Sequence, residues 1–168
     1  MTNSIKTFSN YFAILLLTSF LSACATAPTE TTSSTSTSQS QVVGGVYVGT
    51  ETIEMLAVDV PDRVFFAYDS YSLAALAQTT LNKQVKWLKA NPSVAIAVEG
   101  HADERGTREY NLALGDRRAS SVKDYLMSQG ISSNRISTIS YGKERPVKSG
   151  SNDTAWAQNR RSVSVRTN

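Results

Sequence analysis

The chain has 168 residues, of which 40% are hydrophobic and 18% charged, with 17 Lys and Arg against 14 Asp and Glu. The net charge of +3 is small and scattered, which excludes the basic stripe of a nucleic-acid-binding protein. A single cysteine and a single histidine exclude an intramolecular disulfide, a cysteine zinc cluster and a two-histidine metal site, so we expect neither a metal nor a cofactor.

The first 24 residues, MTNSIKTFSNYFAILLLTSFLSAC, are typical of a secretory signal, with Lys6 before an apolar block and small residues after it. The apolar block, residues 11–21, is shorter than the roughly 20 residues of a membrane-spanning helix. The last four residues, LSAC, resemble the lipobox of bacterial lipoproteins, in which the signal is cleaved and the cysteine is lipidated. We therefore predict a signal peptide over residues 1–23 and a lipid on Cys24. The alternative is an uncleaved anchor with an incidental cysteine.

A polar segment follows the cysteine. Residues 26–41 are almost entirely Thr, Ser, Ala, Pro, Glu and Gln, which cannot bury enough apolar surface to fold. We assign residues 24–45 to the lipidated cysteine and a disordered tether, and residues 62–168 to a folded domain. Residues 46–61 form a more apolar lead-in, for which a short strand and a helix both stay open.

The first half of the domain predicts a strand, a helix and a second strand. Residues 63–68 (RVFFAY) are β-prone, and Asp69 or Ser70 is expected to cap the helix that follows. Apolar residues recur at helical spacing from Leu73 to Leu88, and Asn91-Pro92 ends that pattern. Residues 94–99 (VAIAVE) alternate as a strand, and residues 100–106 are expected to form a turn.

The second half begins with a helix that Thr107 caps and Gly130 ends. Strands are predicted over residues 135–141 and 161–166, with a loop over 142–150 and a helical turn over 153–159 between them. The order β-α-β-α-β-β predicts an α+β fold, a mixed sheet with helices packed on one face.

Charge is concentrated in residues 100–120, GHADERGTREYNLALGDRRAS, which include the single histidine. The residues alone leave three interpretations open. They are a metal or acid–base site, a solvated helix start, and a binding pocket for a small charged ligand.

Three segments, EGHADERGTREYNLALGDRRASSVKDYL, ISTISYGKERP and QNRRSVSV, resemble the OmpA-like domain family in order and spacing, over about residues 62–165. Together with the lipobox and tether, they are most similar to the peptidoglycan-associated lipoproteins of Tol–Pal systems. This resemblance implies an outer-membrane lipoprotein whose periplasmic domain binds peptidoglycan at the meso-diaminopimelate of the stem peptide. It also implies TolB and other Tol proteins as partners, and a role in envelope integrity and in outer-membrane constriction at cell division. Ala25, where an Asp would signal retention in the inner membrane, agrees with that location.

The resemblance also implies a set of site residues. Asp103 and Arg118 map to the central pair, in which an aspartate can pair the ligand ammonium and an arginine can hold its carboxylate with two hydrogen bonds. Further positions that contact the ligand or frame the pocket are Tyr68, Asp69, Arg105, Asn111 and Leu114. The alternatives are a surface salt bridge or solvated helix charges for the central pair, and a plain helix cap for Asp69. Three positions depart from the family pattern: Ala67, Arg108 and Trp156.

His101 raises the competing hypothesis of an enzyme. A peptidoglycan-directed hydrolase could use His101 with Asp103 and Glu104 as a metal site or as general acid and base. This spacing is not that of a zinc site, and the chain has no Ser-His-Asp or Cys-His arrangement. We therefore favour a non-enzymatic anchor, in which His101 braces the end of its strand.

Overall fold

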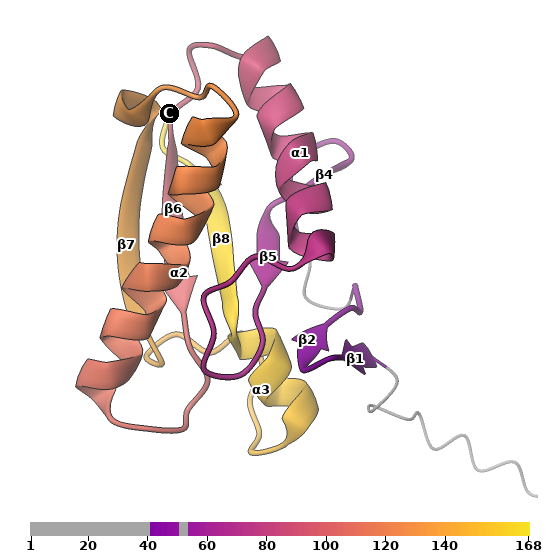
Figure 1. Cartoon of the computed structure of the whole chain (residues 1–168), viewed down its shortest axis with the longest axis vertical. Coiled ribbons are helices and arrows are strands. Elements are labelled where there is room, and N and C mark those ends of the chain that lie inside the picture. Colours follow the sequence, from indigo (N-terminus) through magenta and orange to yellow (C-terminus); the bar gives the residue numbers. More distant parts are fainter. Residues whose placement is uncertain (1–40, 51–53) are drawn as a thin grey trace, which may run out of the picture. The chain divides into compact units, whose positions relative to one another are not determined.

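The computed structural model describes residues 41–50 and 54–168 (Figure 1). The predicted signal peptide, Cys24 and most of the predicted tether lie outside these residues. Within them, no helix combines the length and the apolar character needed to cross a membrane.

A four-stranded mixed sheet forms the body of the domain. Its strands are β5 (Arg63–Phe65), β8 (Arg161–Arg166), β6 (Ile96–His101) and β7 (Ile136–Gly142), in that spatial order. β8 runs antiparallel to both of its neighbours, whereas β6 and β7 are parallel. The helices α1 (Ala75–Ala90) and α2 (Arg108–Ser128) lie on the same face of the sheet (Figure 1). The predicted α+β fold with helices on one face is therefore confirmed.

The core lies between this sheet and the two long helices. Alternation along β6 turns Ile96 and Val98 toward the helices, where both are almost fully buried. The helices contribute the apolar residues whose spacing predicted them: Leu81, Val85 and Leu88 from α1, and Ala119, Val122 and Leu126 from α2. A 3₁₀ turn (Ser133–Arg135) leads from α2 into β7, and the short helix α3 (Asp153–Asn159) precedes β8.

Two glycines let α2 approach the end of β6. A Cβ atom on Gly100 would overlap the carbonyl oxygen of Gly115 in α2, so no larger residue fits there without a shift of the backbone. At the start of α2, the Thr107 hydroxyl accepts a hydrogen bond from the Tyr110 amide at 3.2 Å, which confirms Thr107 as the cap. The start of α2 is thus held at a defined place beside the loop that follows β6.

The segment between β5 and α1 differs from the prediction. α1 begins at Ala75, and the residue before it, Ala74, makes no side-chain capping bond, so the expected cap by Asp69 or Ser70 is wrong. Asp69 instead adopts a φ of 51°, which is uncommon for a residue with a side chain. The Ser70 hydroxyl accepts a bond from the Ser72 amide within the same loop. Residues 66–74 therefore form a loop beside the start of α2 rather than the first turn of a helix.

Short hairpins precede the sheet. β1 (Val42–Val43) pairs with β2 (Val46–Tyr47), and β3 (Met55–Ala57) pairs with β4 (Val60–Pro61). The Tyr47 ring is fully buried and meets the Phe65 ring edge-on, with centroids 4.8 Å apart. In the described part of the lead-in, the open choice is thus settled in favour of short strands. Residues 42–45, which we expected in the tether, take part in the first hairpin, and the boundary of the independently folding domain stays a prediction.

Candidate functional site

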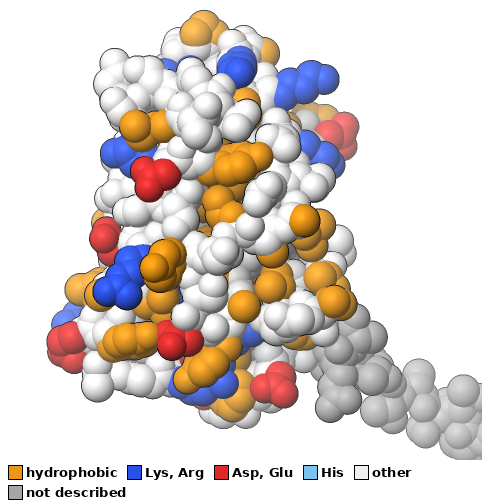
Figure 2. All heavy atoms as spheres, viewed as in Figure 1, with side chains coloured by type: hydrophobic (Ala, Val, Ile, Leu, Met, Phe, Trp, Pro, Cys, Tyr) orange, Lys and Arg blue, Asp and Glu red, His pale blue; other side chains and the backbone are white. Residues whose placement is uncertain are grey.

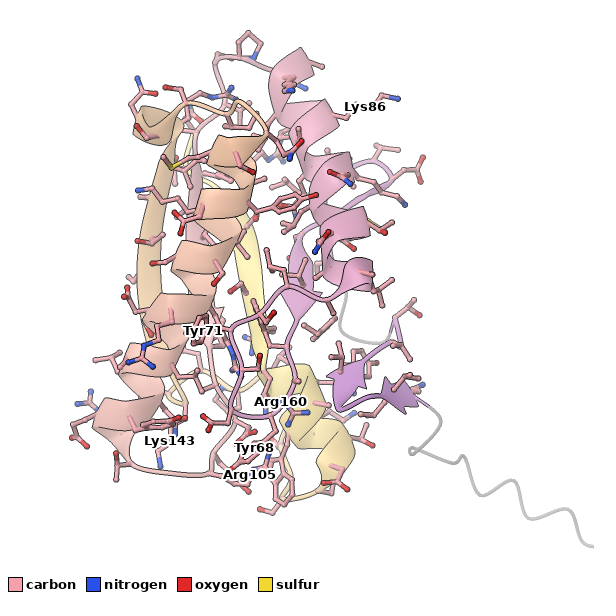
Figure 3. All side chains as sticks on the ribbon, viewed as in Figure 1. Tyr68, Tyr71, Lys86, Arg105, Lys143 and Arg160 are labelled. Atoms are coloured by element: carbon pink, nitrogen blue, oxygen red, sulfur yellow. The ribbon has the colours of Figure 1, made fainter. Side chains whose placement is uncertain are left out.

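Three segments meet at one end of the sheet. They are the loop after β5, the loop between β6 and α2, and the junction between α3 and β8. Figure 3 shows Tyr68 and Arg105 side by side at this end, with Arg160 just above them. On the face shown in Figure 2, acidic, basic and hydrophobic side chains are interspersed over the lower part of the molecule, where α2 begins. The predicted site residues fall in this region.

Asp103 sits two residues after β6 and is only 4% exposed. One carboxylate oxygen accepts from the Arg105 amide and from Arg105 Nε, both at 3.1 Å. The other oxygen accepts from Arg105 Nη2 at 2.6 Å and from Arg160 Nη1 at 3.2 Å. Burial alone would raise the pKa of Asp103, but the bonds from Arg105 and Arg160 outweigh it and hold that pKa below its usual value. The carboxylate is therefore ionised at neutral pH and fixed by two cations.

The Arg105 side chain is clamped between two aromatic rings. Its guanidinium lies 4.1 Å from the centroid of the Tyr68 ring and 4.1 Å from that of the Trp156 ring. Trp156 is held in turn, because its Nε1 donates to the Glu104 carboxylate at 2.9 Å. About a third of the Arg105 side chain remains exposed, and the Tyr68 ring is largely exposed. Arg105 is thus the accessible partner of Asp103.

Arg118 lies beneath the loop after β5 and is fully buried. It donates to three backbone carbonyls, those of Ser70 at 2.8 Å, His101 at 2.7 Å and Ala67 at 3.2 Å. Burial, with a smaller contribution from Arg160, lowers the pKa of Arg118 to about 10, so it is still charged at pH 7. Among the described residues, no hydrogen bond or ion pair joins Arg118 directly to Asp103, although the charge of Asp103 opposes part of this lowering. The expected pair therefore shares a region but not an ion pair, and Arg118 ties the loops after β5 and β6 together.

Asp69 and Tyr110 form a second contact across the site. The Tyr110 hydroxyl donates to the Asp69 carboxylate, and this bond raises the pKa of Tyr110. Both residues are exposed, so Asp69 neither caps α1 nor lies in a closed pocket. The contact links the loop after β5 to the first turn of α2.

Buried and basic groups support the loop between β6 and α2. Asn111 is buried and donates from its amide nitrogen to the Arg105 carbonyl at 2.8 Å, and Leu114 is buried one turn further along α2. Lys143 donates to the carbonyls of Glu104 at 3.2 Å and Gly106 at 2.7 Å. Asn111 therefore fixes the backbone at Arg105, and Lys143 fixes it on either side of Arg105.

The histidine is buried at the end of β6, and neither of its ring nitrogens has a hydrogen-bond partner among the described residues. Nε2 is 3.7 Å from the Glu99 carboxylate, which is too long for a hydrogen bond. Burial, reinforced by Arg161 and by other nearby arginines, lowers the pKa of His101 to about 3. Its contacts with the site run through its backbone carbonyl, whereas the acids of the hypothetical hydrolase, Asp103 and Glu104, have other partners. Within the described residues, no group of three His, Cys, Asp or Glu side chains is placed to hold a metal ion.

Sequence reasoning missed three residues of this site: Tyr110, Trp156 and Arg160. Trp156 stood out only as a departure from the family pattern, and Arg160 only as part of the segment QNRRSVSV. Tyr110 precedes Asn111 at the start of α2 and carried no separate signal. Each of the three contacts a residue that the resemblance did indicate, and only the tertiary structure shows these contacts.

Comparison with known proteins assigns residues 65–160 to the model of the OmpA family. A peptidoglycan-associated lipoprotein of Brucella melitensis is 58% identical over 108 residues, which are 64% of this chain and 64% of that protein. One from Pseudomonas aeruginosa is 50% identical over 97 residues, 58% of this chain and 57% of that protein. The crystal structure of the peptidoglycan-associated lipoprotein from Burkholderia pseudomallei is 42% identical, covers 63% of this chain and 90% of that one, and superposes with a TM-score of 0.62. The predicted resemblance is confirmed, and the matched region spans less than two thirds of the Brucella and Pseudomonas relatives.

Proposed function

Because this chain belongs to the OmpA family, we propose that its domain binds peptidoglycan without cutting it, while a lipid on Cys24 holds the chain in the outer membrane. The observation that carries the proposal is Asp103, an ionised and nearly buried carboxylate at the meeting point of three loops. An anchor with two weak attachments on one chain gains from the high effective concentration of the second site.

The proposed ligand is the stem peptide at meso-diaminopimelate, whose far end carries an ammonium and a carboxylate. The ammonium pairs with Asp103, and the carboxylate pairs with Arg118. Asp103 already accepts four hydrogen bonds, which is about the capacity of a carboxylate. The ammonium therefore replaces a bond from Arg105, because that side chain is partly exposed whereas Arg160 is buried.

Arg118 has capacity for the ligand carboxylate. Its three bonds to carbonyls use three of the five N–H groups of a guanidinium. Because the side chain is fully buried, the ligand reaches it only when the loop over Ala67 and Ser70 moves aside. On this proposal, Arg118 exchanges hydrogen bonds to loop carbonyls for hydrogen bonds to the ligand carboxylate when the peptide binds.

The test is calorimetric titration of the chain with a stem peptide that contains diaminopimelate. A matched peptide with lysine keeps the ammonium but lacks the second carboxylate, and it should bind at least tenfold more weakly, since Arg118 then gains no carboxylate partner from the ligand. Asp103→Ala and Arg118→Ala should each cost about 2–5 kcal/mol of binding, again at least tenfold. Arg118→Lys should weaken binding less than Arg118→Ala, because lysine keeps the charge but loses the paired hydrogen bonds. Circular dichroism verifies the fold of each variant. Equal affinity for the two peptides would overturn the proposed ligand.

The hydrolase hypothesis is tested with purified peptidoglycan sacculi. A non-enzymatic anchor sediments with the sacculi and releases no soluble fragments, whereas a hydrolase releases muropeptides with time. Glu104→Gln, which leaves Asp103 intact, provides the control. Release by the wild-type chain that this variant abolishes would establish the enzyme instead.

Membership of a Tol–Pal system is part of the same proposal. TolB is expected to bind the chain from the periplasmic side, and other Tol proteins complete the system that constricts the outer membrane at division. Cross-linking in cells followed by detection of TolB tests this. Its absence from the cross-linked products would remove the Tol–Pal part while leaving peptidoglycan binding intact.

A further inference from the structure

Arg160 joins three segments of the domain at the candidate site. It is the residue between α3 and β8 and is 4% exposed. Nη1 donates to the Asp103 carboxylate at 3.2 Å, Nε to the Phe66 carbonyl at 3.1 Å, and Nη2 to the Gly45 carbonyl at 2.7 Å. One guanidinium thus connects the carboxylate to the end of β5 and to the first hairpin.

The two arginines on Asp103 differ in how firmly they are held. Arg105 is partly exposed and is gripped by aromatic rings, while the Arg160 side chain is 5% exposed and bonded at all three nitrogens. Breaking a buried ion pair leaves an uncompensated charge, which costs far more than breaking an exposed one. When a ligand cation takes over a bond from Arg105, Arg160 therefore stays and keeps the carboxylate in place.

The first hairpin holds Arg160 from the other side. Gly44 and Gly45 form its turn with φ values of 57° and 76°, and the Gly45 carbonyl faces Arg160. The buried Tyr47 ring anchors the hairpin against Phe65. Between hairpin and loops lies an open cavity of about 400 Å³, lined by Gly45, Arg105 and Arg160 among others.

We infer that Arg160 is a positioning residue for Asp103 and that hairpin β1–β2 completes the peptidoglycan site by fixing Arg160. The inference rests on the proposed function. It extends that function to residues 42–47, which precede the region matched by the family model, residues 65–160. The hairpin is then part of the binding domain and not of the tether.

The first test compares Arg160→Gln with Arg160→Lys in the full chain, purified in detergent and titrated with the diaminopimelate peptide. Arg160→Gln should weaken binding about tenfold or more, the worth of one charged hydrogen bond, while Arg160→Lys, which keeps the charge, should recover most of the affinity. Arg135→Gln is the matched control, since Arg135 also makes three hydrogen bonds, all of them to backbone carbonyls, at the opposite end of β6. It should lower thermal stability and leave the affinity unchanged. Folded Arg160→Gln that binds like the wild type would overturn the inference.

The pH profile separates positioning from simple loss of stability. The charged groups that act on Asp103 are Arg105, Arg118, Arg160 and Glu104. Removal of Arg160 should raise the pKa of the Asp103 carboxyl, so binding should be lost at a higher pH on acidification. Arg135→Gln should leave that midpoint where it is. An unmoved midpoint in Arg160→Gln would contradict the positioning role.

The second test addresses the hairpin at a single position. Gly45→Val places a β-branched residue at a positive φ and should break the turn, whereas Gly45→Asn tolerates this conformation. A Cβ atom at this position meets only Ala67, at 4.0 Å, so packing does not separate the two variants. Gly45→Val should weaken peptide binding about three- to tenfold, within the range of one hydrogen bond, and Gly45→Asn less than twofold. Equal affinity of both variants and the wild type would overturn the role of the hairpin.

Failure of the proposed function gives a different result. If the wild-type chain does not bind the peptide, the proposed ligand is wrong. The positioning role is then decided by NMR titration of the Asp103 carboxyl, which needs no ligand. A higher pKa in Arg160→Gln and in Gly45→Val supports it, and an unchanged pKa refutes it.

Discussion

Replacement of Asp103 by asparagine tests whether the ionised carboxylate organises the loops of the site. The substitution keeps the size of the side chain but removes its charge and one of its two acceptor oxygens. The new amide group would point N–H bonds toward Arg105 or Arg160, which are themselves donors. Arg105 and Arg160 then lose the anion that they share. Because Arg160 is buried, water cannot replace the lost interaction.

The expected loss of stability follows from the burial of the two pairs. Removing one partner of a buried ion pair costs about 3–5 kcal/mol, whereas exposed pairs are worth about 0–1 kcal/mol. The pair of Asp103 with Arg160 is buried, and the pair of Asp103 with the partly exposed Arg105 is intermediate between a buried and an exposed pair. We expect Asp103→Asn to lower the free energy of unfolding by about 2–4 kcal/mol at pH 7. At about 4 °C per kcal/mol for a domain of this size, the melting temperature should fall by about 8–16 °C.

Thermal denaturation followed by circular dichroism between pH 7 and pH 2 measures this effect. The pKa of Asp103 is lowered from its ordinary value of 3.8, so its stabilising contribution is complete above about pH 5 and is lost as the pH falls through the lowered pKa. The difference between wild type and variant should therefore shrink below about pH 4. A difference that stays constant down to pH 2, or a variant as stable as the wild type at pH 7, would refute this account.

Four further substitutions test other parts of the structure and the proposal. Cys24→Ser should abolish incorporation of labelled palmitate and release the chain from the membrane fraction; label in the variant would contradict the lipoprotein interpretation. Gly115→Ala places a Cβ atom against the Ser140 hydroxyl and 2.9 Å from the Gly100 carbonyl, and it should lower the free energy of unfolding in urea by about 2–3 kcal/mol, so an unchanged midpoint would disprove the close contact. Tyr47→Ala should cost about 3 kcal/mol in the same assay, and a loss below 1 kcal/mol would show that the hairpin is not packed on the domain. The pKa of His101 is lowered to about 3, so the ring is neutral in the folded chain and takes up a proton on unfolding at pH 5. The free energy of unfolding should therefore fall from pH 7 to pH 4, and His101→Gln should remove the contribution of this residue to that fall without weakening peptide binding.

The hydrophobic periodicity and the helix-capping signals of the sequence predicted most of the fold. The spacing of Leu81, Val85 and Leu88, the Thr107 cap and the alternation in β6 all appear in the structure as predicted. The start of α1 was not predictable, because a local capping signal at Asp69 and Ser70 competed with long-range bonds. Asp69 binds Tyr110, and the Ser70 carbonyl accepts from Arg118.

The site was predictable in its residue types and not in its connections. The resemblance indicated Asp103, Arg105 and Arg118, but the partners of a guanidinium depend on which carbonyls the tertiary structure brings within reach. Arg118 therefore binds loop backbone in the free chain, and the alternative of a surface salt bridge between Arg118 and Asp103 is wrong. Arg160 lies far along the chain from Asp103, and no local pattern marks such a contact.

The position of β8 determines when the sheet can form during synthesis. β8 spans residues 161–166 and lies between β5 and β6, and among the described strands it is the only one that pairs with β5. On a ribosome, β6, α2 and β7 can associate early, but β5 has no strand to pair with until these late residues emerge. Such non-local pairing folds slowly. A chain with a predicted secretory signal benefits from this delay, because export through a narrow protein channel requires that the polypeptide still be unfolded.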